Sequence, residues 1–215
     1  IITPTVTILV GVGLAYLLAP SIGSMALKIG DLIKLATQLQ PFFMGILVSV
    51  IVGIALTLPI SSAAICAALS LTGLAGGAAL AGCCAQMIGF AVISFKVNRI
   101  AGLISQGIGT SMVQMSNIIK KPKIWITPIL TSAITGPIAT CIFHLEMNGP
   151  AISSGMGTCG LVGQIGVYTG WLNDIALGLK DSITIFDWSG LILISFVLPA
   201  LISLAIHAIL IKNNV

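Results

Sequence analysis

The ionisable side chain that points most clearly to chemistry is Glu146, because it lies beside a glycine- and proline-rich break in a very apolar sequence. A carboxylate in that setting is costly unless it has a partner or a function. Glu146 could accept hydrogen bonds from sugar hydroxyls or titrate. The nearby His144 could help to bind a polyol or modulate the charge of the carboxylate. A second interpretation places both side chains at a helix end, in water, at the outer interface of the cytoplasmic membrane.

Neutral hydrogen-bonding side chains accompany Glu146, as a pocket for an uncharged hydroxylated ligand requires. The same side chains could instead cap half-helices or hold neighbouring helices together. Those that follow Glu146 are Asn148, Ser153, Ser154, Thr158 and Gln164. Those that could line the facing half of the same cavity are Ser61, Ser62 and Gln86.

The chain lacks the common motifs for catalysis. It has no glycine-rich phosphate loop followed by a lysine, no GxSxG nucleophile motif and no cluster with metal-ligand spacing. Its five cysteines lie in apolar or glycine-rich segments, where packing is their usual role. We therefore expect no bound metal, no cofactor and no hydrolysis of ATP by this chain alone.

The composition indicates that most of the surface faces lipid. Nine Lys or Arg and five Asp or Glu occur in 215 residues, 57% of the residues are apolar, and the mean hydropathy is +1.17. Soluble domains use roughly a quarter charged residues. Continuous apolar runs near the ~20 residues that span hydrocarbon predict an all-α, polytopic helical membrane protein. The net charge of +4 is too small and too localised to predict nucleic-acid binding.

The positions of the charges predict an orientation. Lys and Arg gather in cytoplasmic loops, and five of the nine lie between Lys96 and Lys123. The final span, predicted over Leu191 to Ile211, ends at Lys212, so we expect a cytoplasmic C-terminus. The acidic stretch from Asn173 to Trp188 fits the outer face.

We expect a single transmembrane domain over residues 1–215, with roughly six spans or half-spans. Because the chain begins with Ile1, we expect it to be part of a longer protein. Two segments, 21–40 and 100–119, are predicted to be interfacial or re-entrant and amphipathic. The first alternates charged and apolar residues at helical spacing, and the second is too polar to face lipid on all sides.

Two proline-broken segments repeat a short pattern. Pro59-Ile60-Ser61-Ser62 is echoed by Pro150-Ala151-Ile152-Ser153-Ser154, and small-residue turns follow at 72–76 and 159–163. Matching broken segments in two halves of a membrane protein indicate a midplane substrate site. We therefore predict re-entrant helices near both prolines and a possible inverted repeat, against the alternative of coincidence in a low-diversity composition.

Two stretches resemble a known family. Residues 40–49 and 56–65 form one, and residues 148–158 with 160–164 form the other. Both are similar to the bacterial phosphotransferase-system (PTS) EIIC-like membrane family of IIC type 2, which includes the perfringolysin regulator PfoR. The resemblance covers most of the chain.

The resemblance implies a sugar permease component of the bacterial cytoplasmic membrane. We expect the chain to be at most the membrane subunit of a sugar phosphotransferase system and to form a homodimer. A glutamate on a re-entrant hairpin and a nearby histidine contact sugar in such proteins, and Glu146 and His144 match by setting. The usual Glu-Pro order is absent, because Pro150 follows Glu146 by four residues. A phosphorylated IIB-type cytoplasmic partner would supply the phosphoryl group.

Two other functions stay open from the sequence. The chain could be a membrane regulator or sensor of the PfoR type that signals through the basic region between Lys96 and Lys123. It could also be a facilitator or channel for a small polar solute, working without phosphorylation.

Overall fold

The computed structural model describes residues 39–212 without a gap, and before them positions 6, 8, 10–14, 16, 20, 24, 28, 31–33 and 35–37. Most of the predicted first span and much of the predicted 21–40 segment lie outside the described residues. In the described part, regular secondary structure is helical, and β pairing is limited to one isolated bridge between Gly73 and Met147. The predicted all-α class is therefore confirmed.

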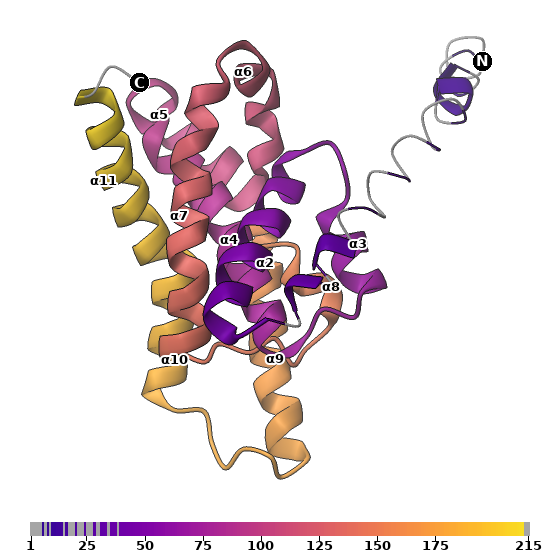
Figure 1. The fold of residues 1–215 in the computed structure, drawn as a ribbon, viewed down its shortest axis with the longest axis vertical. Coiled ribbons are helices and arrows are strands. Elements are labelled where there is room, and N and C mark those ends of the chain that lie inside the picture. Colours follow the sequence, from indigo (N-terminus) through magenta and orange to yellow (C-terminus); the bar gives the residue numbers. More distant parts are fainter. Residues whose placement is uncertain are drawn as a thin grey trace.

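The helices from residue 41 onward include several short or irregular turns between longer segments (Figure 1). The α-helices are α2 (Pro41–Thr57), α3 (Ser62–Ala68), α4 (Gly73–Ile93), α5 (Phe95–Ile104), α6 (Met115–Lys120), α7 (Ile126–Pro137), α8 (Ala151–Ser154), α9 (Val162–Ala176), α10 (Ile185–Ile192) and α11 (Leu198–Lys212). The π-helical turns are η1 (Ser105–Gly109), η4 (Ile138–Ile142) and η6 (Leu193–Val197), and the 3-10 turns are η2 (Ser111–Gln114), η3 (Pro122–Trp125) and η5 (Cys159–Leu161).

Three of the described helical stretches are long and apolar enough to cross a membrane: Gly73–Ile93, Pro122–Ile142 and Ile185–Lys212. The shorter apolar helix α2 packs between α4 and α7. Most of α4 is buried inside the protein, whereas little of the Ile185–Lys212 helix is. The helix α4 is thus the centre of the bundle, and α11 lies at its edge (Figure 1).

The last span begins earlier than the predicted Leu191. Thr184 and Asp187 form a capping box, in which the Thr184 hydroxyl accepts a hydrogen bond from the Asp187 backbone and the Asp187 carboxylate accepts one from the Thr184 backbone. This pair satisfies two of the free N–H groups of the helix start, so the helix begins at Ile185. The predicted turn at 72–76 is also wrong, because α4 begins at Gly73.

Glycine allows the central helices to approach closely. A Cβ atom at Gly82 on α4 would clash with the backbone carbonyl of Ser49 on α2. A Cβ atom at Gly136 on α7 would clash with the carbonyl of Gly45, also on α2. Small residues at helix contacts are typical of membrane proteins, where van der Waals packing holds helices together.

Both predicted breaks occur in the structure. Helix α2 ends at Thr57 because Leu58 precedes Pro59 and takes an extended conformation. Ser61 then caps α3 by accepting a hydrogen bond from the Ala64 N–H at 3.1 Å. The second break places Pro150 immediately before the short helix α8.

The predicted 100–119 segment is also interrupted. Its first half continues α5 into the π-helical turn η1, Thr110 is fully extended, and its second half runs through η2 into α6. The turn η1 packs against α4, so this hairpin reaches the centre of the bundle. Whether the segment is re-entrant in a bilayer stays a prediction.

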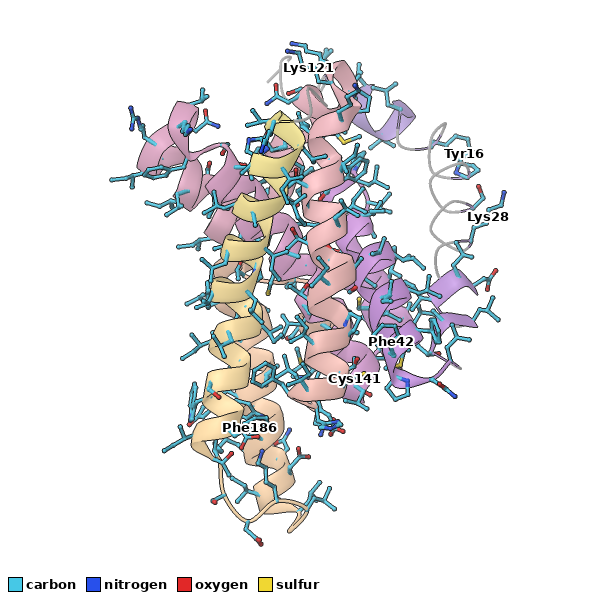
Figure 2. The ribbon with its side chains drawn as sticks, turned by 60° about the vertical axis from the view of Figure 1, so that its left-hand side comes forward. Tyr16, Lys28, Phe42, Lys121, Cys141 and Phe186 are labelled. Atoms are coloured by element: carbon cyan, nitrogen blue, oxygen red, sulfur yellow. The ribbon has the colours of Figure 1, made fainter. Side chains whose placement is uncertain are left out.

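Opposite charges occupy opposite ends of the described bundle. Lys96, Arg99 and the lysines at 120, 121 and 123 lie at the end of the bundle that holds α5, α6 and the last turn of α11 (Figure 1), and Figure 2 labels Lys121 there. Glu146, Asp174, Asp181 and Asp187 lie at the end formed by α9, α10 and the loop between them. We call these the basic end and the acidic end.

Replacing Gly82 with Ala should destabilise the protein. The added methyl group would push α2 away from α4, and overpacking of this kind costs about 1–3 kcal/mol. Thermal unfolding in detergent measures the effect. The matched control is Gly107→Ala, where an added Cβ would meet side-chain carbons at an ordinary 3.5 Å. Equal melting temperatures for the two variants would contradict the proposed role of Gly82.

Candidate functional site

The candidate site is built on an extended backbone segment that follows η4. Gly73 and Met147 exchange two backbone hydrogen bonds of 3.0 Å, which fix this segment against the start of α4. A Cβ at Gly77 would clash with the Leu145 carbonyl, so α4 admits the segment only because glycine stands there. His144 begins the segment with a φ of 44°, a conformation that is uncommon outside glycine.

Helix α9 closes the other side of the segment. A Cβ at Gly149 would clash with the carbonyl of Gly166, and one at Gly170 would crowd the backbone of Asn148 and Gly149. The extended residues therefore lie between two glycine-bearing helices. This arrangement sets the positions of the side chains at 144, 146 and 148.

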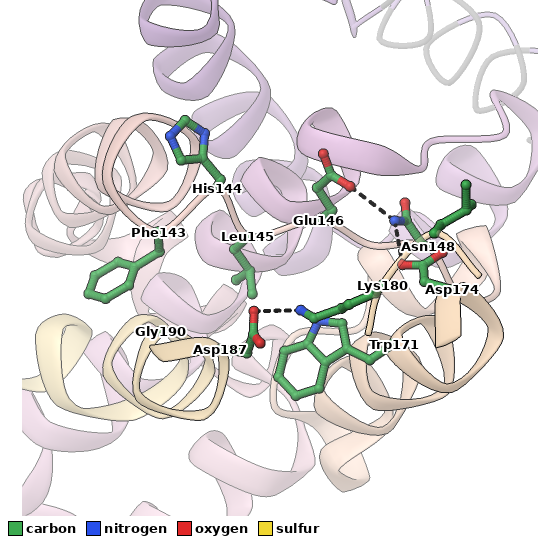
Figure 3. A pocket seen from close by; sticks show the side chains of 11 residues that line it. Phe143, His144, Leu145, Glu146, Asn148, Trp171, Asp174, Lys180, Asp187 and Gly190 are labelled. Atoms are coloured by element: carbon green, nitrogen blue, oxygen red, sulfur yellow. Dashed lines mark hydrogen bonds and ion pairs between the residues drawn. The ribbon is translucent and has the colours of Figure 1, made fainter. Parts of the chain in front are cut away.

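A cavity of about 350 Å³ opens at this place, at the acidic end (Figure 3). Three of the predicted site residues line it: His144, Glu146 and Asn148. The other lining residues come from α9, the α9–α10 loop, α10 and the end of the preceding span; they are Phe143, Leu145, Trp171, Asp174, Leu179, Lys180, Asp187 and Gly190.

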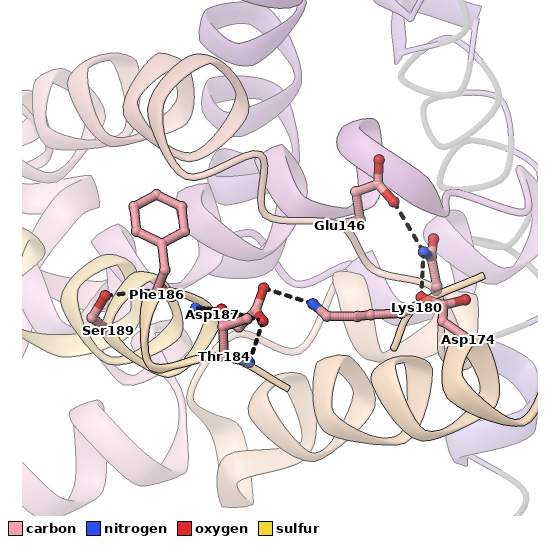
Figure 4. A network of polar contacts seen from close by, with 8 residues as sticks. Glu146, Asp174, Lys180, Thr184, Phe186, Asp187 and Ser189 are labelled. Carbon is pink, nitrogen blue, oxygen red and sulfur yellow. Dashed lines mark hydrogen bonds and ion pairs between the residues drawn. The ribbon is translucent and has the colours of Figure 1, made fainter. Parts of the chain in front are cut away.

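Asn148 connects two carboxylates across the cavity. Its Nδ2 donates hydrogen bonds to Glu146 Oε2 at 3.0 Å and to Asp174 Oδ2 at 2.9 Å, as Figure 3 shows; Figure 4 labels the two carboxylates in a second view. Glu146 is exposed, and Asp174 is half-buried. Each carboxylate keeps further lone pairs that can accept hydrogen bonds from a ligand.

Lys180 supplies the positive charge of the cavity. Its ammonium group lies 2.7 Å from Asp187 Oδ1 and 5.4 Å from the centre of the Trp171 ring. The cavity thus contains three carboxylates, one ammonium group, a histidine and an indole. It can accept several hydrogen bonds from hydroxyl groups and offers an aromatic wall, a combination that suits a polyol.

Sequence reasoning had placed Asp174, Lys180 and Asp187 on the outer face without joining them to Glu146. Nothing in the spacing of these three residues relates them to Glu146, because α8, η5 and most of α9 lie between them and Glu146 in the sequence. One local signal was present: Trp171 and Asp174 are three residues apart and therefore share a face of α9.

The two serine-bearing breaks meet each other. The Ser62 hydroxyl donates a 2.8 Å hydrogen bond to the Gly155 carbonyl, and α3 packs directly on α8. Ser153 packs beneath Gly166 of α9, and the Ser154 hydroxyl donates to the Ala151 carbonyl at 2.7 Å. These residues are buried, unlike Ser61, and do not line the 350 Å³ cavity.

Gln86 lies in a polar cluster in the centre of the bundle. Its Oε1 accepts hydrogen bonds from Thr57 at 3.2 Å and from the Trp125 indole at 3.0 Å. Its Nε2 donates to the Ser132 hydroxyl at 3.4 Å, and Thr57 also contacts Ser111 at 2.9 Å. The cluster joins α2, α4, α7, η2 and η3 without a formal charge.

The last two predicted residues are also separate from the cavity. The Thr158 hydroxyl donates to the Gly107 carbonyl and contacts the Met87 sulfur, which ties the second break to η1 and α4. Gln164 donates to the Cys84 sulfur at 3.5 Å, and its buried Oε1 has no partner among the described residues. The structure therefore places the ten predicted residues in several groups, of which one lines the cavity.

Among the residues that the structure describes, no group of three or more His, Cys, Asp or Glu side chains is placed to hold a metal ion. Comparison with known proteins gives one match: the family described as "Phosphotransferase system, EIIC" matches residues 1–215. No curated protein and no solved structure matches the chain.

Replacing Asn148 with Asp should destabilise the acidic end. The change removes the donor shared by Glu146 and Asp174 and places another carboxylate between these two. We expect the change to lower the free energy of unfolding by about 1–2 kcal/mol. Thermal unfolding measures the loss. Adding Asp174→Asn should restore part of it, since the amide would then lie on α9.

The control for this rescue is Asn148→Asp combined with Asp181→Asn. Asp181 is exposed and does not line the cavity, so removing its charge should not restore stability. Equal rescue by the two second-site changes would mean that only the net charge matters.

Proposed function

The chain belongs to the phosphotransferase-system EIIC family, whose members are the membrane components of sugar uptake, and we propose that it binds a sugar at the acidic end. The observation that carries the proposal is the shared cavity of His144, Glu146 and Asn148, three side chains singled out from the sequence for sugar contact. The carboxylates at 146, 174 and 187 would accept hydrogen bonds from sugar hydroxyls, and Trp171 would form one wall.

The neutral side chains would form the deeper part of the binding path. Ser62, Ser153 and Ser154 are packed together where the two breaks meet, and Ser61 lies at the edge. If the breaks separate, these hydroxyls would face a passing sugar in a neutral midplane cavity, with Thr158, Gln164 and Gln86 behind them. Neutral groups suit this step because they exchange hydrogen bonds without the cost of burying a charge.

The basic end would face the cytoplasm, with the C-terminus on that side. The positive-inside rule supports this orientation, because Lys96, Arg99 and the lysines of α6 and η3 lie there. A phosphorylated IIB-type protein would dock there and transfer its phosphoryl group to the sugar. The charged product could not return through an apolar bundle, so the membrane chain need supply only binding and alternating access.

We also propose that the chain is a homodimer in the bacterial cytoplasmic membrane.

Reconstitution tests the transport function. Proteoliposomes with a complete phosphotransferase cascade should accumulate sugar phosphate from at least one labelled monosaccharide, and only with phosphoenolpyruvate present. Failure for every sugar, together with ligand-induced stabilisation, would favour the regulatory alternative. Downhill flux that ignores phosphoenolpyruvate would favour the facilitator alternative.

Replacing Glu146 with Gln tests the binding site. A hydrogen bond to a charged acceptor is worth about 1.5–3 kcal/mol, so the affinity for the sugar identified above should fall about 10- to 100-fold. Isothermal titration in detergent measures this affinity. The matched control is Asp181→Asn, which removes an exposed carboxylate of the same end outside the cavity and should leave the affinity within about twofold. Unchanged affinity in the Glu146 variant would remove this residue from the site.

A further inference from the structure

A second cavity lies at the opposite, basic end of the bundle. It has a volume of about 380 Å³ and opens between η3 with the first turn of α7 and the last turns of α11. These are the ends of two helices long enough to cross a membrane, Pro122–Ile142 and Ile185–Lys212. Lys121 marks this end in Figure 2. The cavity therefore lies at the level where the hydrocarbon of a bilayer gives way to lipid headgroups.

The cavity has an apolar body and a cationic rim. Ile124 and Leu210 form part of the body, while Lys121 and Lys123 stand at the rim. None of the lining residues is acidic, and neither lysine has an ion pair within the described part of the chain. Two free ammonium groups beside an apolar hollow match an anion with a hydrocarbon tail.

Two polar side chains line the cavity beside the lysines. Thr127 is only 1% exposed, and its backbone carbonyl accepts a 2.9 Å hydrogen bond from the Thr131 hydroxyl. His207 is half-buried in the last span and lines the same cavity. Both groups can donate to the oxygens of a phosphate or glycerol moiety.

We propose that this cavity binds the headgroup of an anionic phospholipid, with Lys121 and Lys123 on the phosphate and Thr127 and His207 on the adjoining oxygens. Basic pockets between transmembrane helices on the cytoplasmic side are suited to such headgroups. Free phosphate has the same charge, but it would leave the apolar body empty. The cavity is also continuous with the outer face of α11, where Ile211 is 61% exposed and available to acyl chains.

The proposal does not depend on sugar transport. A lipid held here would join the first turn of α7 to the end of α11, an edge helix of which little is buried in the protein. It would also compensate the positive charge that the lysines concentrate at this end.

The test measures lipid binding to the full chain in detergent by native mass spectrometry. Phosphatidylglycerol is compared with phosphatidylcholine that carries the same acyl chains. Lys121→Gln with Lys123→Gln should weaken phosphatidylglycerol binding about 10- to 30-fold, since each lysine near a membrane surface contributes about fivefold. Phosphatidylcholine binding should not change. Thr127→Val, which keeps the side-chain shape, should weaken phosphatidylglycerol binding by a few fold.

The matched control is Lys96→Gln with Arg99→Gln, which removes two charges from the same end outside the cavity. Its phosphatidylglycerol affinity should stay within about twofold of the unmodified chain. An equal loss in both double variants would overturn the site in favour of a diffuse basic surface. Displacement of phosphatidylglycerol by millimolar inorganic phosphate would overturn the lipid assignment in favour of a free-anion site.

Discussion

The arrangement of the acidic end depends on one constraint: polar backbone groups that are packed between helices must find hydrogen-bond partners inside the protein. The extended residues 144–150 cannot bond to one another as a helix does. They instead form two backbone bonds with Gly73 and pack between α4 and α9. Because glycines line both contacts, the backbones pack directly on each other. His144, Glu146 and Asn148 then line the cavity, whereas Met147 is buried in the core.

In the centre of the bundle, buried polar side chains find hydrogen-bond partners without any charged group. Gln86, Thr57, Ser111 and Ser132 bond to one another and to the Trp125 indole across several helices. Each hydrogen bond satisfies a group that would otherwise be buried without a partner, and no ion has to leave water. A transport protein gains from such a centre, because helices joined by neutral bonds can exchange partners at low cost.

Between residues 41 and 212, charge is therefore confined to the two ends, and the ends differ in the sign of their net charge. Carboxylates surround the cavity at Glu146, whereas unpaired lysines stand at the cavity beside Thr127. An uncharged hydroxylated ligand suits the first, and an anion suits the second. By the positive-inside rule, the same separation would place the lysine-rich end on the cytoplasmic side, as proposed above.

Composition and pattern were sufficient to predict an all-α membrane protein and helix breaks at Pro59 and Pro150. These properties follow from local chemistry: apolar runs form spanning helices, and proline interrupts them. His144, Glu146 and Asn148 line one cavity because they are neighbours along the chain, and their contact with a sugar stays a prediction.

The sequence could not reveal which distant residues join that group. Asp174, Lys180 and Asp187 reach the cavity only through the packing of α9 and α10. The Ser62 hydroxyl at the first break donates to the Gly155 carbonyl beside the second break and does not line the cavity. The start of the last span was also missed, because it depends on a two-residue cap at Thr184. Local composition determines which segments form helices and which of them are apolar enough to enter a membrane. Contacts between side chains that are remote in the sequence depend instead on how closely glycine lets the helices pack.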